Sequence, residues 1–454
     1  MVSALGGIAG LDLTGLTVGL PVGSAGAVNQ YTQVSGAGRS VAASGLVSNT
    51  GGVLVSADTP PSEQPEPARI SLSQALPAVA NITDAQLAVG AVASSATLDW
   101  YSAVRSSVWG DGSLTGVTRD YGIASLDLEI ESPLVTSLTT SVSQTVTALD
   151  AAVVALAGTN GLISGAIRGV VSAGLALLSV GSVTGTVTVS DLGLTSALGT
   201  LLTTPLTDGG VTIDLTSGIV KVDLAHLLGD DAGGLNDLSP NHEVVLDAAL
   251  VNDVTNRVQS LLEAWSTQVT NTLTSAIGSA TVTVAQRIEV LSILGIRLVF
   301  LNVGLSAPVA SIVAGTTSAP VTLSTPIIGI SLDLLQTLGL STITGVGTVL
   351  TKELTVRVAT LGTTLTATTS SLTTALGTTL AALPSALSLR VNVQPDQPNA
   401  PPGVSFNPGS PPWTSPAYSV TALRLGLLDA VSPSNGFAYL ELARSTAGSS
   451  TAPY

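Results

Sequence analysis

Side chains that could bind a metal ion are concentrated in one stretch of the sequence, from His226 to His242. Among its glycines lie the acidic and amide residues Asp230, Asp231, Asn236 and Asp237. Ca²⁺ takes about six to eight oxygen ligands, which a loop rich in Asp, Asn and Gly can supply from side chains and carbonyls. These four residues are therefore candidate Ca²⁺ ligands, although their spacing matches no established calcium loop.

The alternative interpretation is a solvated turn that binds no metal. In such a turn Asn236 and Asp237 cap local backbone groups, and Ser239-Pro240 begins the following helix. Two imidazoles, His226 and His242, make a weak zinc site in a chain without cysteine. The sequence favours the turn and predicts no cofactor, with bound Ca²⁺ as the alternative.

A second acidic group alternates with apolar residues, as Asp127, Glu129 and Glu131 follow Leu126, Leu128 and Ile130. Paired carboxylates can hydrolyse glycosidic bonds. The alternation is also typical of a half-buried antiparallel strand whose acidic side faces water. Aromatic residues make up only 3% of the chain, which argues against a sugar-binding cleft, and no Gly-x-Ser-x-Gly motif is present. We therefore expect no catalytic residues.

The composition excludes several classes of protein. Charged residues make up 9% of 454 residues, against roughly 25% in a typical domain, and the net charge is −15. This balance argues against nucleic acid as a partner. A mean hydropathy of +0.55 excludes disorder over the whole chain. Residues 298–332 and 358–389 are nearly uncharged, but prolines in the first and hydroxyl residues in the second argue against transmembrane segments.

The hydrophobic pattern divides the chain into strands and long helices. Residues 1–131 are rich in strand patterns, and from Ser132-Pro133 the period changes to about 3.6. Amphipathic helices are predicted over residues 138–156, 250–277 and 354–383. Strands are predicted to follow them over 186–189, 281–284 and 389–393, and β pairs over 211–224 and 418–444.

The recurrence of helix and strand suggests an internal repeat of about 100 residues. We predict an α+β fold in which sandwich-like β layers pack with about three long amphipathic helices. The expected organisation is a β-rich region over 1–131, two helix-plus-hairpin units over 132–240 and 241–345, and a third unit over 346–454 that ends in a β pair.

Several short motifs resemble one known family. The main ones are residues 209–215 (GGVTIDL), 222–224 (VDL) and 234–241 (GLNDLSPN), and similar stretches occur at 28–31, 41–48, 261–265, 418–425 and 440–444. Together they resemble the choice-of-anchor G family of actinobacterial cell-surface proteins. The resemblance covers nearly the whole chain and implies an exported, cell-envelope location, with no established activity to transfer.

The two ends depart from that family. The first basic residue is Arg39, so no signal peptide is recognised, and no sortase motif or apolar tail precedes Tyr454. We expect a non-catalytic extracellular protein of the cell surface with a structural or adhesive role, whose partners are cell-envelope components or further copies of itself. The alternatives are a secreted hydrolase that acts on an envelope or extracellular polymer, and a Ca²⁺-dependent adhesion module.

Overall fold

A computed structural model describes residues 18–19, 29–35, 38–60, 62, 64–73, 76–109, 115–175, 180–228, 233–293, 296–324, 331–406, 417–427 and 438–448. The chain forms two compact units. Unit 1 comprises Met1–Pro133, Pro205–Gln259 and Ser371–Tyr454, and unit 2 comprises Leu134–Thr204 and Ser260–Ser370. Helices combined with antiparallel sheets confirm the predicted α+β class.

These units differ from the four consecutive segments predicted over 1–131, 132–240, 241–345 and 346–454. Each unit combines segments that are distant in sequence, because strands pair across long intervals. In unit 1, for example, Leu128 is paired with Val222 in the neighbouring strand. Segments that follow one another in the sequence therefore do not always belong to the same unit.

Unit 1 contains a seven-stranded antiparallel sheet. Its order is β1 (Val18–Gly19), β4 (Ala68–Ser71), β5 (Asp84–Val89), β8 (Leu126–Glu131), β12 (Ile219–Asp223), β11 (Val211–Asp214) and β10 (Leu206–Thr207). One face is apolar, because side chains alternate along each strand, and Leu87, Leu128 and Val220 on that face are buried. The strand predicted from the alternation of Leu126, Leu128 and Ile130 is confirmed as β8, and the β pair predicted over 211–224 is confirmed as β11 and β12.

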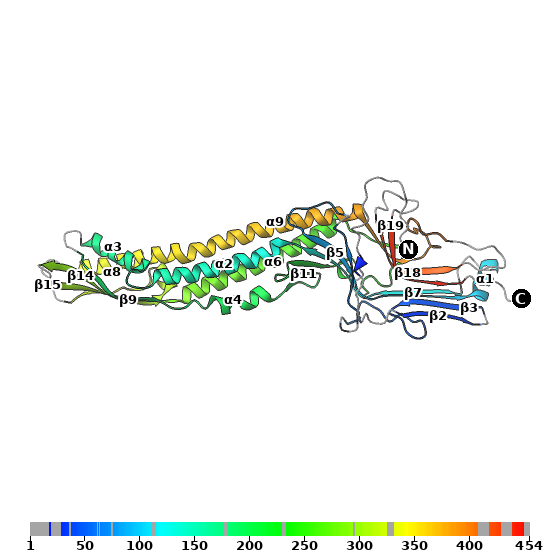
Figure 1. Ribbon diagram of the computed structural model, residues 1–454, viewed down its shortest axis with the longest axis horizontal. Coiled ribbons are helices and arrows are strands. Elements are labelled where there is room, and N and C mark those ends of the chain that lie inside the picture. The colour runs from blue at the N-terminus through cyan, green and yellow to red at the C-terminus, as the bar shows by residue number, and fades with distance from the viewer. Residues whose placement is uncertain are drawn as a thin grey trace. The chain divides into compact units, whose positions relative to one another are not determined.

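Unit 1 also contains two four-stranded sheets packed face to face (Figure 1). The first has the order β2 (Asn29–Ser35), β3 (Arg39–Gly45), β6 (Val92–Asp99) and β7 (Val117–Ile123), and the second β13 (His242–Val244), β17 (Leu387–Val393), β18 (Tyr418–Leu427) and β19 (Ala438–Ala447). Strands β18 and β19 pack against β6, and buried hydroxyls of Ser94 and Ser445 meet at 2.8 Å. The predicted sandwich therefore unites N-terminal with C-terminal strands. Helices α1 (Trp100–Trp109) and α5 (Leu224–Leu228) also lie in this unit.

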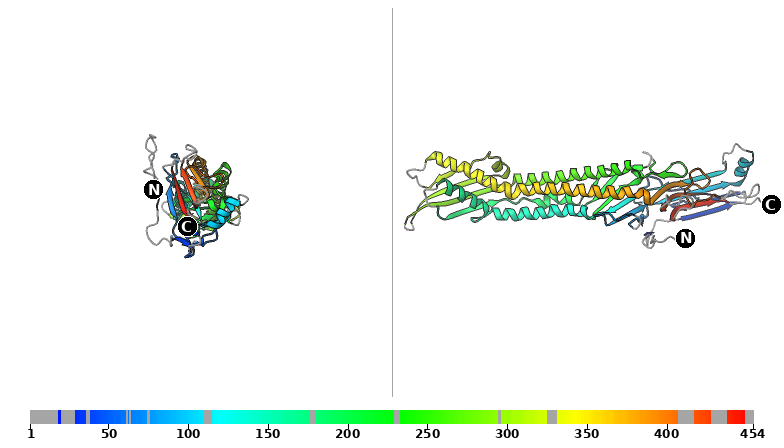
Figure 2. Two further views of the ribbon diagram at one scale, coloured as in Figure 1. Left: turned by 90° about the vertical axis from the view of Figure 1, so that its right-hand side faces the viewer. Right: turned by 90° about the horizontal axis from the view of Figure 1, so that it is seen from above.

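Unit 2 combines long helices with a third four-stranded sheet. The sheet has the order β16 (Val321–Leu323), β15 (Ile296–Pro308), β14 (Thr281–Ile293) and β9 (Val183–Val189). The helices are α2 (Pro133–Leu156), α3 (Leu162–Gly174), α4 (Leu194–Thr203), α7 (Val309–Val313) and α8 (Leu332–Leu350), which continues through a π-helical turn, η3 (Thr351–Thr355). Helices α6 (Ala248–Ser279) and α9 (Val356–Ala386) contribute residues to both units. Within unit 2 the helices α2, α6 and α9 lie side by side (Figure 2).

The three predicted long helices correspond to α2, α6 and α9. Their apolar stripes are buried, as Leu138 in α2, Val258 in α6 and Leu365 in α9 show. Exposed hydroxyl side chains donate back to their own helix; Thr366 Oγ1, for example, donates to the Gly362 carbonyl at 2.9 Å. The helix-to-strand order recurs, but β9 and β14 share a sheet in unit 2 whereas β17 lies in unit 1. The three stretches are therefore not equivalent structural repeats.

One continuous helical stretch of the described chain, residues 332–386, is long and apolar enough to cross a membrane by length and composition. A core helix of a soluble protein has the same properties, so one such stretch is weak evidence of a transmembrane segment. Its apolar side chains Leu350, Leu361 and Leu372 are buried within the protein.

Candidate functional site

The predicted Ca²⁺ loop is only partly described, since Asp230 and Asp231 lie outside the described residues. Asn236 is buried, and its amide binds backbone groups. Its Oδ1 accepts from the Ile123 amide at 2.7 Å, and its Nδ2 donates to the carbonyls of Ile123 at 3.0 Å and Gly233 at 2.9 Å. Asn236 thus caps the end of β7 as well as its own turn. Asp237 follows with a left-handed φ of 58°.

No group of three or more His, Cys, Asp or Glu side chains that could hold a metal is found within the described ranges. His226 lies in α5, and His242 lies in β13, where it is paired with Val391. The four-residue Ca²⁺ site remains a prediction from the sequence.

The segment after Ser239-Pro240 is a strand, so the helix predicted there is wrong. Asn241 adopts a left-handed φ of 59°, and the chain then pairs with β17 as β13. The helix begins later, at Ala248, where Asp247 Oδ1 accepts from the amides of Ala249 at 2.9 Å and Leu250 at 3.0 Å. An aspartate that accepts from the first free amides is a strong helix start signal.

Tyr121 in β7 ties the segment around Asn236 to the sandwich. Its hydroxyl donates to the Leu235 carbonyl at 2.8 Å and accepts from the Leu238 amide at 2.9 Å. Burial raises the pKa of Tyr121 to about 12, because the phenolate would lose its hydration. The hydroxyl therefore stays protonated at neutral pH and holds the segment in place.

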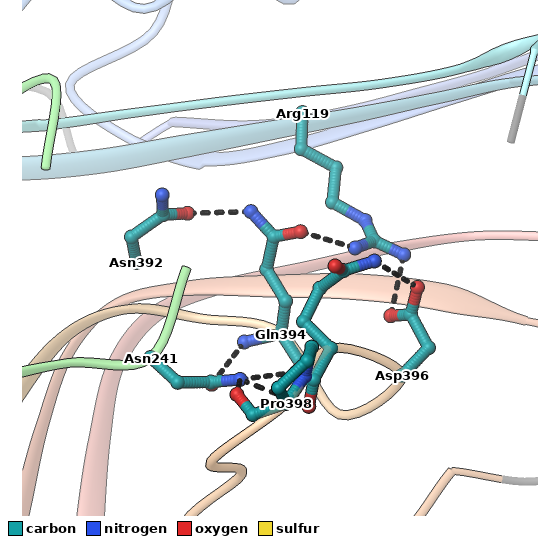
Figure 3. A network of polar contacts seen from close by, with 7 residues as sticks. Arg119, Asn241, Asn392, Gln394, Asp396 and Pro398 are labelled. Atoms are coloured by element: carbon teal, nitrogen blue, oxygen red, sulfur yellow. Dashed lines mark hydrogen bonds and ion pairs between the residues drawn. The ribbon is translucent and has the colours of Figure 1, made fainter. Parts of the chain in front are cut away.

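A buried ion pair forms the centre of a polar network in unit 1 (Figure 3). Arg119 Nη2 lies 2.6 Å from Asp396 Oδ1, and the two side chains are only 6% and 4% exposed. Arg119 also donates to Gln394 Oε1, and its guanidinium lies 5.3 Å from the centre of the Tyr418 ring. Gln394 Nε2 in turn donates to Asn392 Oδ1 at 2.7 Å.

Asn241 forms the other half of this network (Figure 3). Its Nδ2 donates to the carbonyls of Gln394 at 2.9 Å, Gln397 at 3.3 Å and Pro398 at 2.9 Å, and its Oδ1 accepts from the Gln394 amide at 2.8 Å. The network joins β7, the segment before β13 and the segment after β17. Sequence patterns did not single out Arg119 or Asp396. The one signal that could have drawn attention to them is that charged residues are scarce in this chain, so each one is a candidate for a specific role.

The three carboxylates predicted on the wet side of β8 have different environments. Asp127 is only 5% exposed, so its assignment to a wet face is wrong. β8 lies between β5 and β12, and Lys221 Nζ approaches Asp127 Oδ2 to 3.0 Å. Burial raises the pKa of Asp127, although the ion pair with Lys221 opposes the shift. Glu131 is exposed, and Glu129 is 3.1 Å from Arg69.

A groove of about 720 Å³ lies in unit 1 beside the start of α6 and the end of α9. Its lining includes Val245, Leu246, Pro384 and Leu387, together with the ion pair of Glu243 and Arg390 at 2.9 Å. The described strand β13 ends at Val244, opposite Leu389, so it separates from β17 where the groove opens. The groove is largely apolar, with one ion pair and Asp247 among its lining residues, which suits a largely apolar ligand.

Strand β2 is an uncharged edge strand. Among the described strands it pairs only with β3, and six of its seven residues are exposed. Val34 is 81% exposed. Unpaired backbone groups on an edge strand can pair with a strand from another chain, and proteins usually prevent this with charges, prolines or bulges. The sequence of β2, NQYTQVS, has no charge and no proline.

Comparisons with known proteins give one match. A family model described as a domain of unknown function, DUF8394, matches residues 1–448. No curated protein and no solved structure matches the chain.

Proposed function

The chain belongs to the DUF8394 family, and we propose that it is a non-catalytic, exported protein of the cell envelope with a structural or adhesive role. The envelope location is supported by the resemblance of residues 209–215, 222–224 and 234–241 to the choice-of-anchor G family. The proposed partners are envelope components or further copies of the chain.

The uncharged edge of β2 is the observation that carries the adhesive role. Strand addition at a sheet edge obtains its affinity from main-chain hydrogen bonds. The side chains of Thr32 and Val34 are exposed, so a partner strand can approach beside them. Residues 29–48 contain no acidic residue, in a chain with a net charge of −15. The edge is thus a place where a second copy meets little electrostatic repulsion.

Two features support a durable structural role. Many exposed hydroxyls on the helices donate to carbonyls of their own helix, as Thr364 Oγ1 does to Thr360 at 3.0 Å, so the surface is polar without charge. The ion pair of Arg119 with Asp396 and the hydrogen bonds of Asn241 to the backbone link distant segments of unit 1, an arrangement suited to a durable structure. The hydrolase and the Ca²⁺-dependent module gain no specific observation from the described residues.

Accessibility on intact cells tests the location. An antibody against the purified chain should label intact cells of the source bacterium, and externally added protease should remove that signal while a cytosolic marker survives. Labelling that requires lysis of the cells would refute the envelope location.

Charge substitutions in β2 test the adhesive role. Thr32→Lys and Val34→Lys place cations on the edge strand, and Thr267→Lys adds the same charge on an exposed position of α6 as a matched control. We expect the first two variants to lose self-association or binding to isolated envelopes, measured by sedimentation, while Thr267→Lys retains it. Equal binding by all three variants and the unmodified chain would refute the role of β2.

A further inference from the structure

The ion pair between Lys221 and Asp127 differs in chemistry from the other ion pairs described in the protein. The cations Arg69, Arg119, Arg257, Arg357, Arg390 and Arg444 all pair through guanidinium groups. The chain has only two lysines, Lys221 and Lys352. A lysine amine can act as a nucleophile once it loses its proton, whereas a guanidinium stays protonated. One of these two amines lies against a buried carboxyl group.

We propose that Lys221 and Asp127 join in an intramolecular isopeptide bond between β12 and β8. This modification is independent of the proposed envelope function, because it needs only the folded chain.

The geometry places the reacting groups together. Lys221 Nζ lies 3.0 Å from Asp127 Oδ2, and the Asp127 side chain is 7% exposed. The register pairs Lys221 with Glu129 and Asp223 with Asp127, so the two reacting residues are diagonal neighbours on one face. β8 also pairs with β5 on its other side, which fixes the position of the carboxyl group. Groups held in hydrogen-bond contact need little further ordering before the nitrogen can reach Cγ.

The reaction requires no oxidant and no further reactant. Proton transfer within the ion pair produces a neutral amine and a protonated carboxyl group. The lone pair of Lys221 Nζ then forms a bond to Asp127 Cγ. Glu129 accepts a proton from this nitrogen and passes it to the departing hydroxyl group. The Cγ–O bond breaks, one water molecule leaves, and an amide remains.

The surroundings of Asp127 favour its protonated carboxyl group, against the opposing effect of Lys221. Burial of Asp127 raises its pKa, and the negative charges of Asp223 and Glu129 act in the same direction. Arg69 binds Glu129 at 3.1 Å and holds it on this face. The Lys221 side chain is 45% exposed, so water competes with the carboxyl group for contact with its amine. We therefore expect the bond to form slowly after folding.

The bond would join the strand after which the chain leaves unit 1 to a strand that follows its return. Between β8 and β12 the chain leaves unit 1, contributes Leu134–Thr204 to unit 2, and returns. An amide between these strands would covalently link the two ends of the segment that contributes to unit 2. The chain has no cysteine, so a disulfide cannot provide such a link.

Intact-mass spectrometry of the full purified chain tests the proposal. We expect the measured mass to fall below the sequence mass by the mass of one water molecule. After trypsin digestion, peptide 120–168 should be found joined to peptide 169–257, because an amidated Lys221 is no longer cleaved. A chain that keeps its full sequence mass after prolonged incubation and yields a free peptide 169–221 would overturn the proposal.

Variants locate the bond and the proton route. Lys221→Arg keeps the positive charge and should retain the full sequence mass, whereas the matched control Lys352→Arg should still lose water. Glu129→Gln should slow the loss of water. Arg69→Gln leaves the Glu129 carboxylate in place and should not abolish the loss of water. Circular dichroism checks that each variant is folded. Water loss in Lys221→Arg would overturn the assignment of this bond, and an unchanged rate in Glu129→Gln would overturn the role of Glu129.

Discussion

Removal of the Asp396 carboxylate should strongly destabilise unit 1. In the Asp396→Ala variant the guanidinium of Arg119 stays buried, and its remaining described contacts are Gln394 and the ring of Tyr418, neither of which carries a negative charge. Its side chain is 6% exposed, so water cannot replace the lost carboxylate without disrupting the packing. An uncompensated buried charge of this kind costs roughly 3–5 kcal/mol.

The magnitude can be tested by a double-mutant cycle. Arg119→Met alone leaves the Asp396 carboxylate buried, with its contact to Gln397 Nε2 at 3.0 Å. The double variant leaves no unpaired charge, so we expect its loss of stability to be smaller than the sum of the single losses, by about 1–3 kcal/mol. Asp253→Ala is the matched control, because it breaks a surface ion pair with Arg257 in the same unit. That change should cost less than about 1 kcal/mol.

Urea unfolding followed by tryptophan fluorescence measures these losses. Trp265 is the tryptophan within the residue ranges of unit 2, so a Trp265→Phe background confines the signal to unit 1. At about 2–4 °C per kcal/mol, the Asp396→Ala change also corresponds to a fall in Tm of roughly 6–20 °C. A loss in Asp396→Ala no larger than that in Asp253→Ala would show that the Arg119–Asp396 pair is solvated, and would refute the reasoning.

Three further predictions concern other polar residues. Asn241→Ala removes four hydrogen bonds to buried or partly buried backbone groups and should lower the free energy of unfolding by roughly 2–4 kcal/mol in the same urea assay. An unchanged midpoint would contradict the network. Hydrogen bonds from Thr216 and Ser217 lower the pKa of Asp214 from 3.8 to about 2, so its contribution to stability is full above pH 3.8 and is lost as the pH falls towards 2. Thr216→Val should raise the Asp214 midpoint in an NMR titration and reduce the stability lost over that interval, and an unmoved midpoint would refute this cause. The Tm should be equal in Ca²⁺ and in EGTA because Asn236 already binds backbone groups; a Ca²⁺-dependent rise that Asp230→Asn and Asp231→Asn abolish would instead establish the predicted site.

Local patterns in the sequence predicted the elements well. The long helices follow from apolar residues at a helical period, and the stripe through Leu138 and Leu149 is buried as expected. The alternation around Leu128 correctly separated the two faces of β8. These features depend on residues near one another in the chain, so the sequence contains them directly.

The environment of the polar residues could not be predicted, because it depends on distant partners. Asp127 forms an ion pair with Lys221, which lies in the distant strand β12. Arg119 and Asp396 form an ion pair although 277 residues separate them in the sequence. Asn236 was recognised as a polar turn residue, but its partner Ile123 lies 113 residues earlier. The sequence pattern identifies which face of a strand is polar. Whether that face is exposed to solvent depends on the residues that pack around it in the fold.

The interleaving of the two units has a consequence for biogenesis. In the second sheet of the sandwich, β17, β18 and β19 all lie beyond Ser371, so this sheet cannot assemble until the end of the chain has been synthesised. Of these late strands, β18 and β19 pack against β3, β6 and β7 from the first third of the chain. Contacts over such long intervals make folding slow. Unit 1 therefore cannot complete its fold until translation is nearly finished, whereas every residue of unit 2 has been synthesised once Ser370 is reached.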